Sequence, residues 1–171
     1  TDHSNIKIEN CNIRKGIGLG IAALTSSKIS IKNCNIEQNG SDGIFASENS
    51  VITAENSVIK ENYRHGIWAY RGARAEIKKC RIEFNKHLGI AISERANAVI
   101  TNNKILGNNH DGIVIFKNGK ANIENNECID NNGVGIYVSN QSTKATLKNN
   151  TLKENHEDGI LFYDKAEGWV E

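Results

Sequence analysis

The sequence predicts an all-β fold wound into a solenoid, and three repeated features carry this prediction. A Gly-Ile pair recurs every 23 residues, with one step of 24, at Gly20, Gly43, Gly66, Gly89, Gly112, Gly135 and Gly159. Apolar residues alternate with polar ones at fixed distances from that glycine, and asparagine returns at two further fixed distances. A constant period of roughly 20–50 residues is typical of solenoids and repeat arrays. Alternation with a period of two is typical of strands that bury one face.

Three stretches of each repeat have the alternation expected of a strand. With the glycine as position 0, apolar residues occupy positions −14 and −12, position −7, and positions +1 and +3. Position +1 is isoleucine in all seven repeats. Each coil is therefore expected to hold three short strands, near positions −14 to −11, −8 to −6 and +1 to +4. The seven coils begin near Asn5, Lys28, Val51, Arg74, Asn97, Lys120 and Lys144.

Two other repeat architectures fit the pattern less well. A leucine-rich repeat has a similar length, but it requires a frame of leucines and a helical half that this sequence lacks. A left-handed hexapeptide helix requires a period divisible by six, and the period of 23 is not. The remaining solution is a right-handed, single-stranded parallel β-helix with seven 23-residue coils. Equivalent positions of successive coils are then about 4.8 Å apart.

Asparagine columns and the repeated glycine fit stacked coils. Position −4 is asparagine at Asn39, Asn62, Asn85, Asn108, Asn131 and Asn155, and a stacked column can hydrogen-bond amide to amide along the axis. Position −10 is asparagine at Asn10, Asn33, Asn56, Asn102, Asn125 and Asn149. Asparagine tolerates the left-handed backbone of a sharp turn, so we expect a turn there. We expect the glycine at position 0 to serve the same left-handed geometry.

The four cysteines fall on interior columns. Cys11, Cys34 and Cys80 share position −9, and Cys128 replaces an isoleucine at position −7. All four are expected to be buried as small residues. Stacked neighbours about 4.8 Å apart exceed the roughly 3.8 Å Cβ separation of a disulfide, so no disulfide is expected.

Residues 1–171 are expected to form a single β-helix domain with a partial coil at each end. Residues 1–4 fit the tail of an earlier coil, and Trp169 and Val170 fit the start of an eighth. Neither end has an amphipathic capping helix, which solenoids use to protect open strand edges. We therefore expect either a segment of a longer protein or end-to-end self-association.

Composition and charge exclude several classes of partner. The chain has 21 Lys plus Arg and 20 Asp plus Glu, a net charge of +1, whereas nucleic-acid binders have a basic excess. No apolar run approaches the roughly 18 residues of a transmembrane helix, so membrane insertion is not expected. No repeated glycine-rich calcium motif is present, and no cofactor is expected.

The repeat G-I-x-[AIV]…[AI]-x-I-x-N-[NC]-x-I-x-x-N resembles the parallel β-helix repeat family of carbohydrate-binding proteins and sugar hydrolases. That family includes pectate-lyase-like enzymes, the periplasmic copper-processing protein NosD and the β-helix domain of certain F-box ubiquitin-ligase receptors. The resemblance covers residues 5–166. It implies the β-helix fold and, by analogy, a sugar-related activity. It also implies a secreted, periplasmic or cell-surface location, or a cytoplasmic one for an F-box-like receptor.

The outward side of the Gly-Ile strand has the most distinctive surface. Positions +2 and +4 should point outward because +1 and +3 point inward. Together they place Phe45, Trp68, Tyr70, Phe116, Tyr137 and Tyr163 on one face. Aromatic faces stack on sugar rings or anchor protein interfaces, and a covering loop is the alternative reading. We expect Trp68, near the middle, to contribute most to binding and its ring to lie outside the core.

Charged and imidazole side chains gather at the turn beside that face. Positions −2 and −1 include Asp42, Arg64, His65, His87, His110 and Asp111. These residues could bind an anionic sugar, while a turn is also where charged residues lie by default. Arg64 with His65 is the best pair for the base and the charge-neutralising group of a lyase or epimerase. A metal at His87 and His110 would need a third ligand, and because the spacing matches no metal motif, no metal site is expected.

The sequence therefore favours a binding or scaffold module that presents an aromatic face to a polysaccharide or to a protein or peptide. The alternative is a polysaccharide-acting enzyme, a lyase, epimerase or hydrolase, with its His, Arg and Asp residues on the same face. The absence of a serine–histidine–aspartate or paired-glutamate arrangement favours the binding module.

Overall fold

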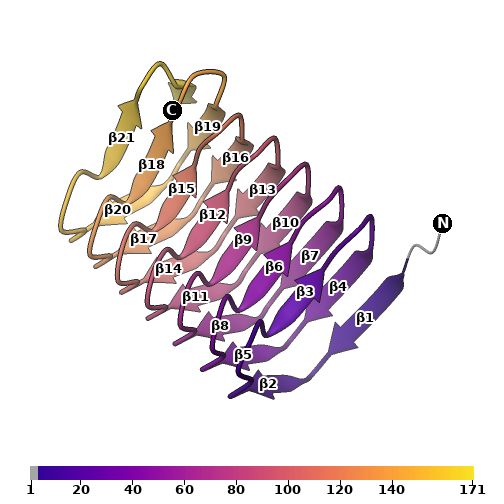
Figure 1. Cartoon of the computed structure of the whole chain (residues 1–171). Helices are drawn as coiled ribbons and strands as arrows, with labels where there is room; N and C mark the ends of the chain where they lie inside the picture. Colours follow the sequence, from indigo (N-terminus) through magenta and orange to yellow (C-terminus); the bar gives the residue numbers. More distant parts are fainter. Residues whose placement is uncertain (1–3) are drawn as a thin grey trace.

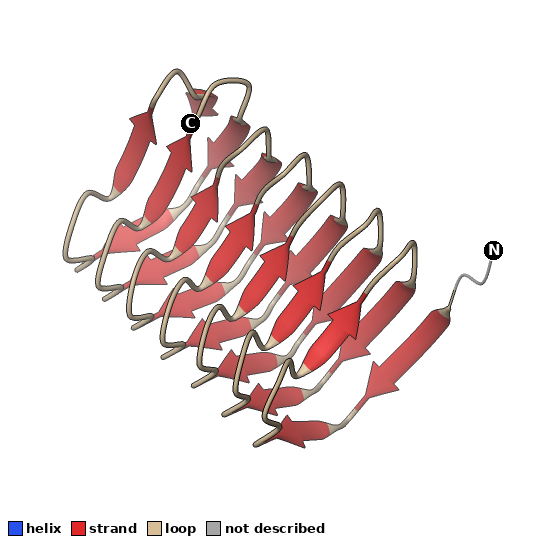
Figure 2. Cartoon of the chain, in the orientation of Figure 1, coloured by secondary structure: helices blue, strands red, loops and turns tan. Residues whose placement is uncertain are grey.

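The chain forms three parallel sheets wound into one solenoid (Figure 1), as a computed structural model describes it for residues 4–171. This part of the chain contains strands, turns and loops and no helix (Figure 2). It therefore has no apolar helix of membrane-spanning length. Residues 1–3, part of the predicted tail of an earlier coil, lie outside the described residues.

Each sheet collects one strand from every coil. The first sheet contains β1 (Asn5–Glu9), β4 (Lys28–Lys32), β7 (Val51–Glu55), β10 (Arg74–Lys78), β13 (Asn97–Thr101), β16 (Lys120–Glu124), β19 (Lys144–Lys148) and β22 (Glu167–Val170). The second contains β2 (Asn12–Arg14), β5 (Asn35–Glu37), β8 (Val58–Lys60), β11 (Arg81–Glu83), β14 (Lys104–Leu106), β17 (Glu127–Ile129) and β20 (Thr151–Lys153). The third contains β3 (Ile21–Ala23), β6 (Ile44–Ala46), β9 (Ile67–Ala69), β12 (Ile90–Ile92), β15 (Ile113–Ile115), β18 (Ile136–Ser139) and β21 (Ile160–Tyr163).

The register between strands follows the sequence period. Ile67 pairs with Ile44 on one side and with Ile90 on the other, so the isoleucines of position +1 form a continuous column. That column is fully buried at Ile44, Ile67, Ile90, Ile113 and Ile136. The predicted three strands per coil, and the one-to-one stacking of coils, are confirmed. Each interior isoleucine contributes very roughly 1.5–3 kcal/mol through burial, before entropy is subtracted.

The asparagine column at position −4 runs along the axis as predicted. Asn39 Nδ2 donates to Asn62 Oδ1 at 3.0 Å, and the same bond is repeated from coil to coil as far as Asn155. Each of these Oδ1 atoms also accepts the backbone N–H of the preceding asparagine at 3.1 Å. Among the described residues, no buried side-chain nitrogen or oxygen lacks a hydrogen-bond partner. The polar interior is thus fully satisfied, as stability requires.

The turn at position −10 is left-handed as predicted, with φ between 48° and 58° at its asparagines. The prediction for the glycine at position 0 is wrong, because the positive-φ glycines in residues 4–171 are Gly72 and Gly107. From Gly20 to Gly135, position 0 requires glycine for lack of space, whereas an added Cβ on Gly159 would make only ordinary contacts. A Cβ on Gly66 would lie 2.7 Å from the carbonyl oxygen of Gly89 and 2.5 Å from Cγ2 of Ile82.

All four cysteines are free thiols, as expected from their spacing. Cys34, Cys80 and Cys128 are buried. Burial raises the pKa of the Cys80 thiol to about 11. The prediction of burial is wrong for Cys11, which is exposed in the first described coil.

Candidate functional site

Three aromatic rings meet on the outer face of the third sheet. Phe45 on β6 and Trp68 on β9 are in-register neighbours, and their ring centroids are 5.3 Å apart in an edge-to-face arrangement. Tyr70 follows β9, and its ring centroid lies 5.1 Å from that of Trp68 and 6.4 Å from that of Phe45. All three rings are half-buried. We call Phe45, Trp68 and Tyr70 the aromatic cluster.

The Trp68 ring extends along the axis toward the next coil. Its Nε1 donates to Ser93 Oγ at 3.0 Å, and both Ser93 and the in-register neighbour Ala91 are fully buried. Leu88, Ala91 and Val114 form a small apolar cluster that is separate from the interior core of the solenoid. Trp68, Phe116 and Tyr137 pack against this cluster. The Trp68 ring thus lies outside the interior core, as expected, but it packs against a second apolar cluster, because side chains on an outer face also cover one another.

The remaining predicted aromatics are spread along the same sheet. Phe116 and Tyr137 are half-buried on coils five and six, and Tyr163 at the end of β21 is 63% exposed. Between Trp68 and Tyr137, position +2 contains Ala91 and Val114. The structure thus brings three of the six predicted aromatics into mutual contact and leaves Tyr163 apart from them.

Side chains at position −1 bind the backbone of the following coil. Asp42 Oδ1 accepts the N–H of His65 at 3.0 Å, and His65 Nδ1 accepts the N–H of Leu88 at 3.3 Å. Asp111 Oδ1 accepts the N–H of Val134 at 2.7 Å. Asp42 and His65 are 1% and 6% exposed. All three predicted site residues are therefore engaged in the fold, and the buried Asp42 and His65 present little surface to a ligand, whereas Asp111 is half-buried.

Three imidazole rings form a row beside the aromatic cluster. The His65 and His87 centroids are 4.7 Å apart, edge to face, and the His87 and His110 rings are stacked at 4.3 Å. His87 and His110 are exposed. Arg64 lies with its guanidinium carbon 5.3 Å from the centroid of the Trp68 ring, and its Nη1 is 3.9 Å from Asp42 Oδ2. This Arg64–Trp68 contact joins the charged turn to the aromatic cluster.

Burial and neighbouring charges set the protonation of the row. Burial, with smaller contributions from His87, Arg64 and His110, lowers the pKa of His65 to about 3. The pKa of His87 is also lowered, first by the partial burial of its largely exposed side chain and then by His110 and Arg64. Burial raises the pKa of Asp42, against the opposing effects of the His65 N–H and of Arg64. At neutral pH both His65 and His87 are therefore neutral, and Arg64 carries the permanent positive charge.

His65 has little capacity to exchange a proton with a ligand. Its Nδ1 accepts the Leu88 N–H, so in the neutral ring the proton is on Nε2 and neither nitrogen is free to take another from a ligand. His87 has no such bond and is accessible.

Among residues 4–171, no three His, Cys, Asp or Glu side chains gather in a way that could hold a metal ion.

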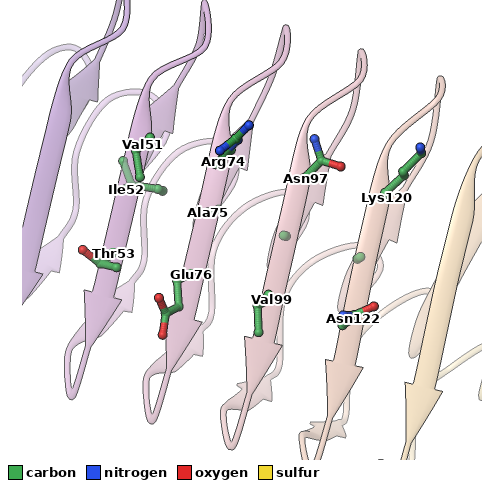
Figure 3. Close-up of a pocket in the computed structure, with 12 residues that line it drawn as sticks. Val51, Ile52, Thr53, Arg74, Ala75, Glu76, Asn97, Val99, Lys120 and Asn122 are labelled. Atoms are coloured by element: carbon green, nitrogen blue, oxygen red, sulfur yellow. The ribbon is translucent and has the colours of Figure 1, made fainter. Parts of the chain in front are cut away.

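The outer face of the first sheet is also hollowed (Figure 3). A shallow trough of about 370 Å³ crosses β7, β10, β13 and β16, between one row that contains Arg74, Asn97 and Lys120 and a second that contains Glu76 and Val99. A larger polar hollow of about 760 Å³ adjoins it where the chain turns from the third sheet into the first. Our sequence reasoning missed both, because it examined only the outward positions that carry aromatic side chains.

Comparison with known proteins agrees with this architecture. A family model described as a right handed beta helix region matches residues 1–143 and 42–171, which together span the chain. The predicted right-handed winding and the resemblance to β-helix repeats are confirmed. A search of curated proteins finds no match.

Three solved structures have a similar fold. A mutant of the periplasmic alginate epimerase AlgG is 18% identical at a TM-score of 0.70, and the match covers 88% of this chain and 38% of that one. The mannuronan C-5 epimerase AlgE4 A-module of Azotobacter vinelandii is 16% identical at a TM-score of 0.63, with 95% and 57% covered. The Agl-KA catalytic domain is 16% identical at a TM-score of 0.54, with 100% and 44% covered. The chain therefore spans about half the length of these structures or less, and the likeness establishes the fold.

Proposed function

We propose that this chain, which belongs to the right-handed β-helix family, binds an extended acidic polysaccharide on the outer face of its third sheet. The observation that carries the proposal is the contact between Arg64 and the aromatic cluster. A guanidinium over the Trp68 ring, with Phe45 and Tyr70 alongside, offers both an apolar platform and a positive charge. Sugar rings bind to such platforms through their apolar faces, and carboxylate groups bind to guanidinium.

The spacing of the coils supports an extended ligand. Successive strands lie about 4.8 Å apart, which is close to the repeat of a sugar ring in an extended glycan, on the order of 5 Å. A glycan along the axis therefore meets about one outer side chain per coil. Phe45, Trp68, Phe116 and Tyr137 lie on coils two, three, five and six of the same sheet, and His110 on coil five is exposed beside them. Two of the three similar solved structures are named as an alginate epimerase and a mannuronan epimerase, which favours a uronic-acid polymer as the ligand.

A second candidate is catalysis on the same polymer, and one observation favours it. His87 is an accessible neutral imidazole in contact with two other imidazoles, next to the coil that carries Arg64. A neutral imidazole can take a proton, and a guanidinium can neutralise a carboxylate during that step. The buried His65 is the weaker base of the two, because its Nδ1 is occupied and its pKa is lowered to about 3.

Calorimetric titration with alginate oligosaccharides tests binding, with uncharged dextran as the neutral reference. We expect Trp68→Ala to weaken alginate binding at least tenfold, a hot-spot magnitude. Trp169→Ala is the matched control, because Trp169 is 67% exposed on β22 of the first sheet. Equal affinities for the wild type and both variants would overturn the proposal.

The catalytic alternative is tested on the same samples. Ultraviolet absorbance of unsaturated sugars detects a lyase, and proton NMR of the polymer detects epimerisation. Turnover that His87→Ala abolishes, with binding retained, would favour the enzyme over the binding module.

A further inference from the structure

The polar hollow of about 760 Å³ lies at the corner between the third and first sheets. It is lined by the turns that follow β6, β9 and β12 and by the start of the strands that come next. Three arginines contribute to the lining, namely Arg71, Arg74 and Arg95, and all three are exposed. They come from two adjacent coils. We call this space the arginine hollow.

None of the three guanidiniums forms a salt bridge with a carboxylate in residues 4–171. Two glutamates also line the hollow, but each is engaged elsewhere. Glu48 accepts the hydroxyl of Thr25 at 2.8 Å, and Glu94 pairs with Lys117 at 3.4 Å. Three arginines thus face two glutamates in the arginine hollow, and one of these glutamates is paired with Lys117, so positive charge is in excess there and none of the three arginines has a carboxylate partner.

A missing side chain helps to shape the hollow. Gly72 has φ +76°, and it occupies the turn position that Asn49 fills one coil earlier and Arg95 fills one coil later. A Cβ on Gly72 would lie 2.5 Å from Asn49 Oδ1. The column of turn side chains is thus interrupted at its middle coil, between two coils whose side chains line the hollow.

The arginine hollow adjoins the aromatic cluster. The Arg71 guanidinium carbon is 5.1 Å from the centroid of the Tyr70 ring, and that ring contacts Trp68. On the other side, Arg74 also lines the trough of the first sheet, where Figure 3 places it in one row with Asn97 and Lys120. The aromatic cluster is thus joined through Arg71 to the arginine hollow at the corner between the sheets.

We propose that Arg71, Arg74 and Arg95 form an anion-binding subsite that takes a sulfate or carboxylate group of an acidic glycan. This inference rests on the proposed function and extends it to a second contact region. Guanidinium groups bind planar and tetrahedral oxyanions through paired N–H donors, and they remain charged at every relevant pH. A glycan whose ring stacks on Tyr70 would bring a charged substituent to the corner.

The test compares Arg74→Gln/Arg95→Gln with a control of equal charge, Arg14→Gln/Lys153→Gln. Both control residues are exposed on the second sheet, away from the hollow. The probes are alginate oligosaccharides, dextran sulfate and uncharged dextran, titrated calorimetrically at one ionic strength. We expect the hollow variant to weaken binding of the alginate or the sulfated probe at least tenfold, and the control less than twofold. The more affected probe identifies carboxylate or sulfate as the group bound.

Equal weakening by the two double variants would overturn the inference, because the effect would then be a general one of net charge. Measuring Trp68→Ala with the same probes distinguishes failure of this inference from failure of the proposed function. If Trp68→Ala weakens binding and the hollow variant does not, the subsite is refuted and the aromatic cluster remains the site. If the hollow variant weakens binding and Trp68→Ala does not, the subsite stands and the aromatic cluster is refuted. If the wild type binds neither charged probe, both are refuted.

Discussion

His65 Nδ1 accepts a hydrogen bond from the backbone N–H of Leu88 at 3.3 Å, which links the third coil to the fourth at the turn beside the aromatic cluster. Asp42 does the same for His65, and Asp111 does so for Val134. Side chains at position −1 therefore link one coil to the backbone of the next along part of the solenoid. This link explains why three residues that appear suited to bind a ligand have their polar atoms directed at the chain itself.

The neutral His65 makes stability depend on pH. The ordinary pKa of 6.5 is lowered to about 3 in the folded state. As the pH falls below about 6.5, the unfolded chain gains a proton that the folded chain does not. The free energy of unfolding should then fall by about 1.4 kcal/mol per pH unit for this group until about pH 3. His87, whose pKa is also lowered, acts in the same direction. Asp42, whose pKa is raised above 3.8, acts in the opposite direction in a window just above that value.

Denaturant unfolding followed by circular dichroism from pH 7 to pH 4 measures this dependence. His65→Asn is the informative variant, because its side-chain oxygen could accept the Leu88 N–H as Asp42 Oδ1 accepts the His65 N–H. We expect a flatter pH dependence in the variant. Parallel curves for the wild type and His65→Asn would show that another group is responsible.

A charge in the isoleucine column should unfold the central coils. Ile67 is fully buried on β9, and Ile67→Lys would place an ammonium group there without a partner. Burying an unpaired charge costs several kcal/mol, a large share of the stability of a domain. Ala22→Lys is the control, because Ala22 is exposed on the outer face of the same sheet. Loss of the β-sheet circular dichroism signal in Ile67→Lys alone is the expected result, and equal melting temperatures would contradict the assignment of the inner face.

The glycine at position 0 should be intolerant of a single methyl group. Gly66→Ala would bring a Cβ within 2.7 Å of the Gly89 carbonyl oxygen, so the coils would have to move apart. Overpacking of this kind costs about 1–3 kcal/mol. Gly18→Ala provides the control, since nothing lies within 4 Å of its added Cβ. Thermal unfolding should show a lower melting temperature for Gly66→Ala only, and similar values for the two variants would refute the close-approach explanation.

Trp68 should contribute to stability as well as to binding. Trp68→Ala removes the hydrogen bond to Ser93 Oγ and uncovers Ala91. We expect the free energy of unfolding to fall by about 1–3 kcal/mol, from the lost hydrogen bond and the lost apolar burial. Trp68→Phe, which retains a ring over Ala91, should recover part of that loss. Unchanged stability in Trp68→Ala would mean that the ring makes no packing contribution, which would contradict the half-buried position found here.

The sequence predicts which repeat positions of the candidate site lie on the same face of the solenoid. It does not predict which side chains contact one another there. Alternation along the Gly-Ile strand correctly brings Phe45 and Trp68 together, since their positions are in register on neighbouring strands. The same reasoning placed His65 beside them, yet could not foresee that its ring turns toward the Leu88 N–H. The position of a residue in the repeat determines where its Cβ lies. The direction of a long side chain depends in addition on the hydrogen-bond partners and packing contacts that the next coil provides.

The sequence alone determined the all-β solenoid, its seven coils, its three strands per coil, the isoleucine column and the asparagine column. It could do so because every coil contacts only its neighbours, so one period of 23 residues sets every register. Only the tertiary structure decided that the glycine is required by the approach of the next coil, that Trp68 helps to cover a second apolar cluster, and that three arginines without carboxylate partners line one hollow. These features depend on distances between side chains of adjacent coils, and a repeat pattern specifies the stacking of the backbone but not those distances.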